Sequence, residues 1–244
     1  MDVSIIITSY NYSSYIEECI NSCLSQSGTS LDYEIIVVDD GSTDETPAIL
    51  EKIINSKVKK FRIINSGIEA ASNYGINRSQ GRFIVRVDAD DGLMPNYLKC
   101  MESNLDDCSG FYYSDYAVID KSGQTTGKMA LPSFNPDEIR SRGDFLATGT
   151  LYSAQVLKDC GYYSEIIKNS GLENYELILR LISSGVSGKH IPEQAFCYRR
   201  HALNISVTKI DQIMSNGHNL FSRMGYGTYR TNEYHPYLVG SLVK

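Results

Sequence analysis

Short apolar runs alternate with amphipathic segments along the first 110 residues. Runs rich in Ile and Val are typical of strands buried on both faces of a sheet, and they occupy residues 3–8, 34–38, 61–64 and 83–87. Between these runs, apolar residues recur at helical spacing. Strand and helix therefore alternate as β-α-β-α-β-α-β, which predicts an α/β fold with a doubly wound sheet.

The segments that follow the first two strands carry two predicted capping boxes. Ser14 with Glu17, and Ser42 with Glu45, have the spacing in which each side chain satisfies a free backbone N–H at a helix start. No Gly-x-Gly-x-x-Gly follows the first strand, and the chain has no Gly-Lys-Ser/Thr loop. Dinucleotide binding and P-loop chemistry are therefore disfavoured.

The regular alternation ends near residue 110. A short strand at 111–113, a hairpin over 117–128, helices at 154–160 and 172–183, a connector at 190–192 and a strand at 195–198 are predicted. An amphipathic helix follows from about residue 210. The simplest organisation is one domain, residues 1–208, with a nucleotide-binding half (1–110) and an acceptor-binding half (111–208), followed by a C-terminal helix and tail (209–244).

Composition narrows the class of protein. The 244 residues are 42% hydrophobic and 21% charged, which is ordinary for a soluble globular protein. A net charge of −6 argues against a general nucleic-acid binder, which would carry a basic face. No apolar run has the length of a membrane span, and no basic-then-apolar leader follows Met1. The six cysteines lack Cys-x-x-Cys spacing, so we expect core thiols in a cytoplasmic protein.

Acidic residues follow two of the predicted strands. Asp39 and Asp40 end one strand, and Asp88, Asp90 and Asp91 end another. Ligands bind at the carboxyl ends of strands in open α/β sheets. Three like charges this close favour a divalent cation, Mn²⁺ or Mg²⁺, shared with phosphate oxygens. The alternative is a solvated acidic turn.

Three stretches in this order resemble glycosyltransferase family 2: residues 5–11 (IIITSYN), 37–44 (VVDDGSTD) and 88–91 (DADD). The resemblance extends from residue 3 to about 205. It implies a GT-A fold, that is, a Rossmann-like mixed sheet flanked by helices in a single domain, with a nucleotide-sugar donor, a divalent metal and inversion at the anomeric carbon. The chain has no Trp, so the Gln-x-x-Arg-Trp motif of processive synthases is absent and transfer of a single sugar is predicted.

The resemblance assigns the donor base to one group of residues. Thr8, Tyr10 and Asp40 would contact the base, with Asp39 nearby. A carboxylate such as Asp40 can accept the imide N–H of uracil, which favours UDP. Gly67 would let the backbone approach the base and ribose closely.

The acid cluster is assigned to the ribose and the diphosphate. Asp90 would face the ribose, Asp91 would hold the metal, and Asp88 is the first acid of the motif. Such a metal stabilises the negative charge that develops on the leaving diphosphate.

A basic loop at 199–204 resembles a family loop that often carries a histidine. His201 is predicted to contact the metal or the diphosphate, with Arg199 or Arg200 on phosphate. The alternative is a solvated basic turn.

Two positions depart from the family pattern. Glu173-Asn174 stands where the family usually has Glu-Asp, whose Asp is the base, and an amide cannot accept the proton. Glu173 could serve instead, the protein could be a weakened or non-catalytic sugar-nucleotide binder, or Asn174 could be a substitution made to trap a complex; an active enzyme using Glu173 is favoured. Ser72 stands where the family commonly has Arg, so one cation near the nucleotide is expected to be missing.

The expected partners are a nucleotide-sugar donor and a glycan or lipid-linked acceptor, with no nucleic acid. The tail tyrosines Tyr226, Tyr229, Tyr234 and Tyr237 could cover a homodimer surface or approach the inner face of a membrane. A sugar-1-phosphate nucleotidyltransferase would share the sheet topology. It would need a Gly-rich basic loop after the first strand, which residues 9–12 lack.

Overall fold

The computed structural model describes residues 1–146 and 148–230. Within them, nine strands form one mixed sheet in the order β3-β2-β1-β4-β8-β6-β9-β5, with β7 paired to β6. The strands that carry the regular alternation are parallel: β1 (Val3–Ser9), β2 (Tyr33–Asp39), β3 (Val58–Arg62) and β4 (Phe83–Asp88). The connecting helices are α1 (Ile16–Leu24), α2 (Thr46–Lys52) and α3 (Ile68–Ile76).

The central parallel strands bring the acidic residues to one edge of the sheet. All residues of β1 and β2 are buried, as expected for strands covered on both faces. The register aligns Ser9 with Asp39 and Thr8 with Asp88. β1, β2 and β4 therefore end at the same level, and the polar residues that follow them in the sequence lie close together.

The second half of the sheet is partly antiparallel. β8 (Leu151–Ser153) runs antiparallel to β4 and β6, β7 (Thr125–Met129) is antiparallel to β6, and β5 (Gly92–Leu93) is antiparallel to β9. β6 (Ser109–Ile119) and β9 (Ser187–Arg199) form a long parallel pair. The predicted mixed sheet is confirmed, but the connector predicted at 190–192 is wrong. Pro192 lies inside β9, where the pairing with β6 shifts register between Ser114 and Asp115, and an irregularity of this kind accommodates a proline.

Both predicted capping boxes are wrong. α1 begins at Ile16 after Tyr15, α2 begins at Thr46 after Glu45, and neither has a side-chain cap. Ser42 Oγ instead accepts the Asn11 backbone N–H at 2.9 Å. The polar side chain is thus used to join the loops that follow β1 and β2.

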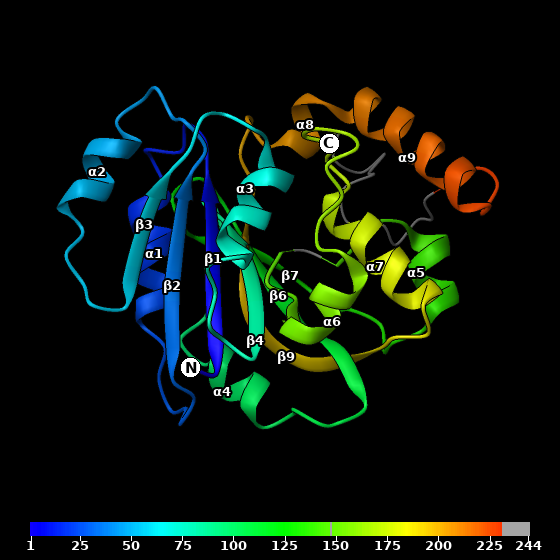
Figure 1. Cartoon of the computed structure of the whole chain (residues 1–244), viewed down its shortest axis with the longest axis horizontal. Helices are drawn as coiled ribbons and strands as arrows, with labels where there is room; N and C mark the ends of the chain where they lie inside the picture. Colours follow the sequence, from blue (N-terminus) through cyan, green and yellow to red (C-terminus); the bar gives the residue numbers. More distant parts are fainter. Residues whose placement is uncertain (147, 231–244) are drawn as a thin grey trace.

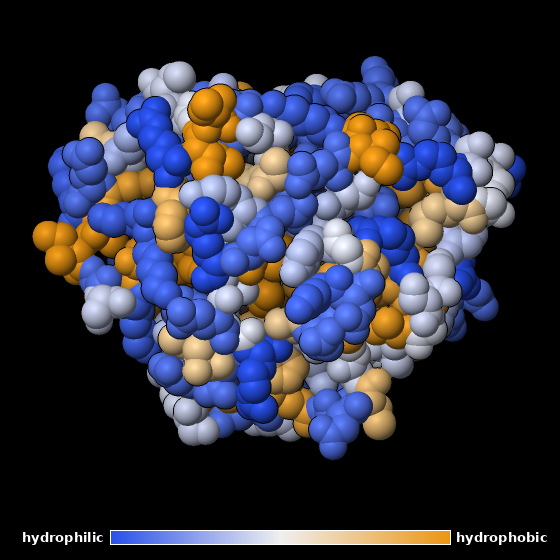
Figure 2. All heavy atoms as spheres, in the orientation of Figure 1, coloured by the Kyte–Doolittle hydropathy of each residue, from blue (hydrophilic) through white to orange (hydrophobic). Residues whose placement is uncertain are grey.

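The remaining helices gather beside the antiparallel half of the sheet (Figure 1). They are α5 (Pro136–Arg142), α6 (Ala154–Cys160), α7 (Glu173–Ser183), α8 (Ile205–Thr208) and α9 (Ile210–Met224), while α4 (Tyr97–Glu102) lies at the opposite end of the strands from α8. None of the described helices is both long and apolar enough to cross a membrane. On the face drawn in Figure 2, apolar side chains form small separate groups among polar ones.

One of the tail tyrosines, Tyr229, does not take the surface role that the sequence left open for them. Tyr229 is buried, and its ring centroid lies 5.0 Å from that of Phe221 on α9. Gly217 makes room for it, since a Cβ there would lie 2.3 Å from the Tyr229 ring. Tyr229 is therefore part of the interior and cannot cover a dimer or membrane surface; Tyr234 and Tyr237 lie outside the described residues.

Replacing Gly149 with Ala is expected to destabilise the protein strongly. Gly149 has a φ of +90°, and a Cβ there would lie 2.4 Å from the Phe196 ring. Left-handed strain costs about 1–2 kcal/mol, and overpacking adds about 1–3 kcal/mol.

Gly161→Ala is the matched control, because Gly161 has a φ of +82° and open space around it. Urea unfolding of both variants separates the two terms. Equal destabilisation of the two would show that Phe196 yields freely to the added methyl group.

Candidate functional site

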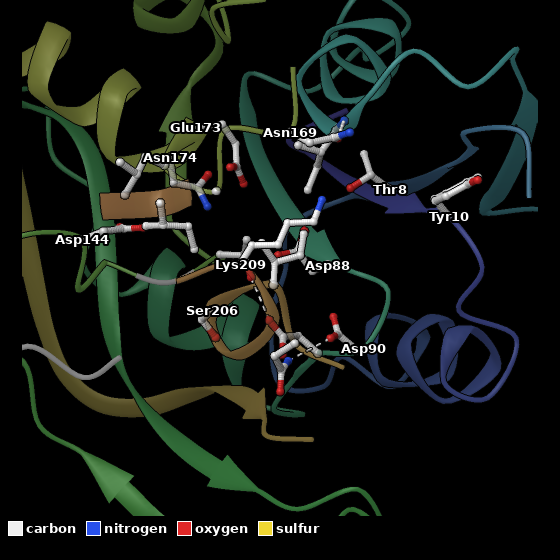
Figure 3. Close-up of a pocket in the computed structure, with 18 of the residues that line it drawn as sticks. Thr8, Tyr10, Asp88, Asp90, Asp144, Asn169, Glu173, Asn174, Ser206 and Lys209 are labelled. Carbon is white, nitrogen blue, oxygen red and sulfur yellow. Dashed lines mark hydrogen bonds between the residues drawn. The ribbon is translucent and has the colours of Figure 1, made fainter. Parts of the chain in front are cut away.

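A pocket with a cavity volume of about 360 Å³ opens at the carboxyl ends of β1 and β4. Figure 3 shows Thr8 and Tyr10 at one end and Asn174 and Asp144 at the other. The acidic residues that follow β4 lie between these ends. The pocket is thus lined by residues of both the regular and the irregular half of the chain.

Asp40 is held rigidly at the first end of the pocket. Its Oδ1 accepts the Ser66 backbone N–H at 2.6 Å, and its Oδ2 accepts the Gly67 N–H at 2.9 Å. Gly67 has a φ of +96°, and a Cβ there would lie 2.6 Å from Lys168 Cγ. Gly67 does not line the pocket. A glycine is required here because the backbone is left-handed and because a Cβ would collide with Lys168. Gly67 affects the pocket through its backbone N–H, which holds Asp40.

Thr8 offers an available hydrogen-bonding group beside Asp40. Its Oγ1 is buried without a partner among the described residues, which is unusual for a buried hydroxyl. Tyr10 lies at the rim and is partly exposed. Asp39 does not line the pocket, because its carboxylate accepts the Ser42 N–H at 2.9 Å and lies 3.5 Å from Arg62 Nε.

Each acid after β4 has different partners. Asp91 accepts the Arg199 backbone N–H at 2.9 Å and the Thr148 hydroxyl at 3.0 Å. Asp90 Oδ2 accepts from His201 Nε2 at 2.9 Å. Asp88 Oδ1 has no hydrogen-bond partner among the described residues, although Arg86 Nη2 lies 3.4 Å away.

Two carboxyl groups of this cluster, those of Asp88 and Asp91, resist ionisation. Burial raises the pKa of Asp88 to about 7; Arg86 opposes the shift, while Asp90 and Glu173 add to it. Burial, with Asp90 and Asp88, raises the pKa of Asp91 well above its ordinary range. Excess negative charge in a closed space favours a cation as its partner.

The donor set fits a divalent cation only in part. Among residues 1–146 and 148–230, no three His, Cys, Asp or Glu side chains are grouped so as to hold a metal by themselves. Mg²⁺ is commonly held by one or two carboxylates together with substrate phosphates. Asp91 and the unpartnered oxygen of Asp88 could supply these one or two protein carboxylates, and substrate phosphate oxygens would complete the coordination.

The basic loop has a structural role that the sequence did not predict. His201 Nδ1 accepts the Leu203 N–H at 3.2 Å, so the tautomer with hydrogen on Nε2 donates to Asp90. That tautomer leaves no nitrogen lone pair for a metal. The predicted metal contact of His201 does not fit this arrangement, and His201 orients Asp90 instead.

The predicted phosphate contacts of Arg199 and Arg200 also do not fit. The Arg199 guanidinium donates to the Asp90 and Asp120 carbonyls and pairs with Glu18 at 2.7 Å. Neither arginine lines the pocket. Arg199 holds the acidic turn in place from behind.

Arg86 supplies the positive charge between the acidic turn and α7. It is buried on β4, its Nη2 lies 2.8 Å from Glu173 Oε1, and its Nη1 lies 3.5 Å from Ser72 Oγ. A cation was expected to be missing because Ser72 replaces the family Arg. In the structure, Arg86 lies beside Ser72 and supplies a cation there. It comes from strand β4 and not from helix α3, which carries Ser72.

Asn174 is fixed at the N-terminus of α7. Its Oδ1 accepts the Tyr163 hydroxyl at 3.0 Å, and Figure 3 shows its amide nitrogen directed into the pocket. Glu173 beside it is buried and paired with Arg86. Both side chains therefore have partners within the protein, whereas the predicted base would need an oxygen free to accept the proton of the acceptor.

Two charged residues in the described lining, Asp144 and Lys209, were not predicted from the sequence. Asp144 follows α5, and Lys209 lies between α8 and α9. Lys209 is the only Lys or Arg among the described lining residues, and Figure 3 shows it extended across the pocket above the acids. Both lie in segments without a clear periodic pattern, so only their charge could have marked them.

Comparison with known proteins identifies related sequences. The family model "Glycosyl transferase family 2" matches residues 4–157. A chondroitin synthase of Escherichia coli is 30% identical over 239 residues, which cover 93% of this chain and 34% of that protein. The Escherichia coli enzyme described as UDP-Glc:alpha-D-GlcNAc-diphosphoundecaprenol beta-1,3-glucosyltransferase WfaP is 30% identical over 227 residues, covering 90% and 86%. The chain thus spans about a third of the synthase but most of the glucosyltransferase.

Solved structures share the fold. The structure of S. aureus TarS 1-349 in complex with UDP-GlcNAc has a TM-score of 0.74 at 20% identity, covering 96% of this chain and 69% of that one. The mannosyltransferase PcManGT from Pyrobaculum calidifontis, in complex with GDP-Man and Mn2+, has a TM-score of 0.69 at 16% identity, covering 95% and 66%. The predicted GT-A fold class is confirmed.

The Asp88→Asn variant is expected to gain stability over the wild type as the pH rises. The folded-state pKa of Asp88 is about 7, above the ordinary 3.8. Between these values the folded state binds a proton that the unfolded state has lost, so stability falls with rising pH. Asn carries no charge, and we expect the Tm of Asp88→Asn to exceed the wild-type Tm at pH 8 by about 2–4 °C for each kcal/mol relieved.

The difference should shrink towards pH 4.5. Asp137→Asn is the control, because that carboxylate is 92% exposed on α5. Thermal unfolding from pH 4.5 to 8 without added metal measures the effect. A constant difference across this range would contradict the raised pKa.

Proposed function

Because the chain belongs to glycosyltransferase family 2, we propose that it moves one sugar from a UDP-sugar to a hydroxyl of a glycan or lipid-linked acceptor, with inversion at the anomeric carbon. The observation that carries the proposal is a single pocket with a hydrogen-bonding end at Thr8 and Asp40, an acidic centre, and a separate end at Asn174. The order of these three parts suits the base, the diphosphate and the sugar of a nucleotide-sugar. A cytoplasmic location, at the inner face of the membrane for a lipid-linked acceptor, is part of the same proposal.

The proposed donor contacts follow from the free groups of the pocket. The Asp40 carboxylate, fixed by two backbone N–H groups, keeps lone pairs for the imide N–H of uracil. Thr8 Oγ1 has no other partner among the described residues and would bind the base as well. Tyr10 would stack on its ring at the rim, and Asp90, oriented by His201, would accept a ribose hydroxyl.

The diphosphate would lie between the acids and Lys209. Asp91, with Asp88, would hold Mn²⁺ or Mg²⁺ there, as the Mn2+ complex of a structural neighbour supports. When bound, such a cation stabilises the charge on the leaving diphosphate. Lys209 would donate to the phosphate oxygens from the opposite side, since it is the only Lys or Arg among the described lining residues.

The second candidate is a weakened or non-catalytic sugar-nucleotide binder, which Asn174 favours because an amide is no general base. The two candidates share donor binding and differ in turnover. UDP release from UDP-sugars in the presence of hydroxyl acceptors distinguishes them. Addition of one residue only, and no longer series, is expected of the transferase.

Donor binding is expected to require both uridine and a metal. Calorimetric titration with UDP, GDP, dTDP and CDP, each with and without Mn²⁺, should show tight binding of UDP with Mn²⁺ only. Asp91→Asn should weaken this binding at least tenfold, because a carboxylate ligand is lost. Absence of binding by every nucleoside diphosphate would make the acid cluster a solvated turn.

Lys209→Ala should weaken UDP binding by about tenfold, the value of one charge-assisted contact of about 1.4 kcal/mol. The loss should be smaller for uridine, which has no phosphate. Lys158→Ala on α6 is the matched control, because it removes an exposed lysine that does not line the pocket. Equal losses for UDP and uridine would place Lys209 elsewhere.

A further inference from the structure

An inverting transfer needs a group that accepts the proton of the attacking hydroxyl. Asn174 cannot be that group, because an amide oxygen is far less basic than a carboxylate. Its Oδ1 is also engaged with the Tyr163 hydroxyl at 3.0 Å. The base must therefore be a carboxylate at the same end of the pocket.

Glu173 is a poor candidate for this role. Its Oε1 lies 2.8 Å from Arg86 Nη2, and both side chains are buried. To accept a proton from the attacking hydroxyl, this carboxylate would have to give up its ion pair with Arg86. Protonation would also leave the Arg86 charge with less compensation, which is costly inside a protein.

Asp88 belongs to the other side of the reaction. It follows β4 directly and is 3.4 Å from Arg86 Nη2, within the acidic turn that includes Asp90 and Asp91. In the proposed function this turn faces the ribose and the leaving diphosphate. An inverting base acts on the opposite face of the sugar, away from the leaving group.

Asp144 has the position that the reaction requires. α5 ends at Arg142, and Gly143, with a φ of +89°, turns the chain so that Asp144 lines the pocket. Figure 3 shows Asp144 at the end occupied by Asn174 and Glu173, away from Thr8 and Tyr10. Its carboxyl group is close enough to Glu173, Arg86 and Asp88 to experience their charges.

We propose that Asp144 is the catalytic base of this chain and takes over the role that a carboxylate at position 174 would have. This rests on the proposed function. The acceptor oxygen forms a bond to C1 of the sugar, and its proton passes to an Asp144 carboxylate oxygen. The bond between C1 and the phosphate oxygen breaks, and its electron pair leaves with UDP.

The surroundings of Asp144 suit a base. Burial raises the pKa of Asp144 well above its ordinary range, with Glu173 and Asp88 adding to the shift and Arg86 opposing it. A raised pKa makes the ionised carboxylate a stronger proton acceptor, and the Arg86 charge favours the ionised form that a base requires. Asn174 then has a purpose, since its amide N–H groups can position the acceptor without adding one more negative charge beside Asp144.

The Asp144→Asn variant tests the base directly. UDP release from UDP-N-acetylglucosamine and UDP-glucose with Mn²⁺ would be measured, with water or octyl hexosides as the attacking hydroxyl. We expect kcat to fall at least 100-fold, the usual contribution of a general base, while UDP affinity stays within threefold. Asp137→Asn, the same change at an exposed position of α5, should keep wild-type kcat.

Changes at position 174 give an independent test. In the wild-type background, Asn174→Asp should lower kcat severalfold, because a second carboxylate beside Asp144 holds one of the two protonated. In the Asp144→Asn background, the same change should recover activity at least tenfold. This pattern would assign the base to Asp144.

Two results would overturn the proposal. One is an Asp144→Asn variant that keeps kcat within threefold of the wild type. The other is a tenfold or larger rise in kcat for Asn174→Asp alone, which applies even if Asp144→Asn fails to fold. A wild-type protein that binds UDP but releases none from any UDP-sugar would refute the proposed function together with the base, whereas an active Asp144→Asn variant refutes the base alone.

Discussion

The buried guanidinium of Arg86 is the interaction on which the pocket depends. It stands on a central strand and pairs with Glu173 at the start of α7, with Asp88 3.4 Å away at the end of its own strand. Strand β4 and helix α7 are far apart in the sequence. Without Arg86 between them, the ionised carboxylates of Asp88 and Glu173 would repel one another. A buried ion pair adds little net stability, but loss of one partner costs about 3–5 kcal/mol. Arg86 therefore fixes which arrangement of the carboxylates the fold can adopt.

The same charge sets limits on the chemistry of the site. A single buried cation can compensate one or two carboxylates, and the described lining includes six: Asp40, Asp88, Asp90, Asp91, Asp144 and Glu173. Asp40 and Asp90 are compensated by hydrogen bonds, and Glu173 by Arg86. Asp88, Asp91 and Asp144 remain with raised pKa values. These three groups, whose ionised forms burial disfavours, are those to which we assign metal binding and proton transfer, because both tasks use a carboxylate that gains by acquiring a cation or a proton.

The sequence predicted the regular half of the fold well, because buried parallel strands are continuous apolar runs and their ends carry the acidic motifs. It failed where a tertiary contact replaced a local one. Ser42 was predicted to cap α2, but it joins two loops across the sheet edge. His201 was predicted to contact the metal or the diphosphate from its residue type and loop; that role stays a prediction, and the structure adds hydrogen bonds from its ring to Asp90 and from the Leu203 N–H to its Nδ1. Such competition for lone pairs and donors cannot be read from spacing.

The acceptor end was the least predictable part for a related reason. Asp144 and Lys209 come from segments that follow short helices. α5 packs against α7, and α9 contacts α7 through the Phe221 and Tyr175 rings, whose centroids lie 6.2 Å apart. Tyr229 completes this wall from beyond α9, where Gly217 admits its ring. Ile213 and Met214 on α9 add apolar surface to the same wall. A sugar presents both hydroxyls and apolar C–H faces, so an end that combines Asp144 and Asn174 with this apolar wall can orient one hydroxyl for attack while it excludes competing water.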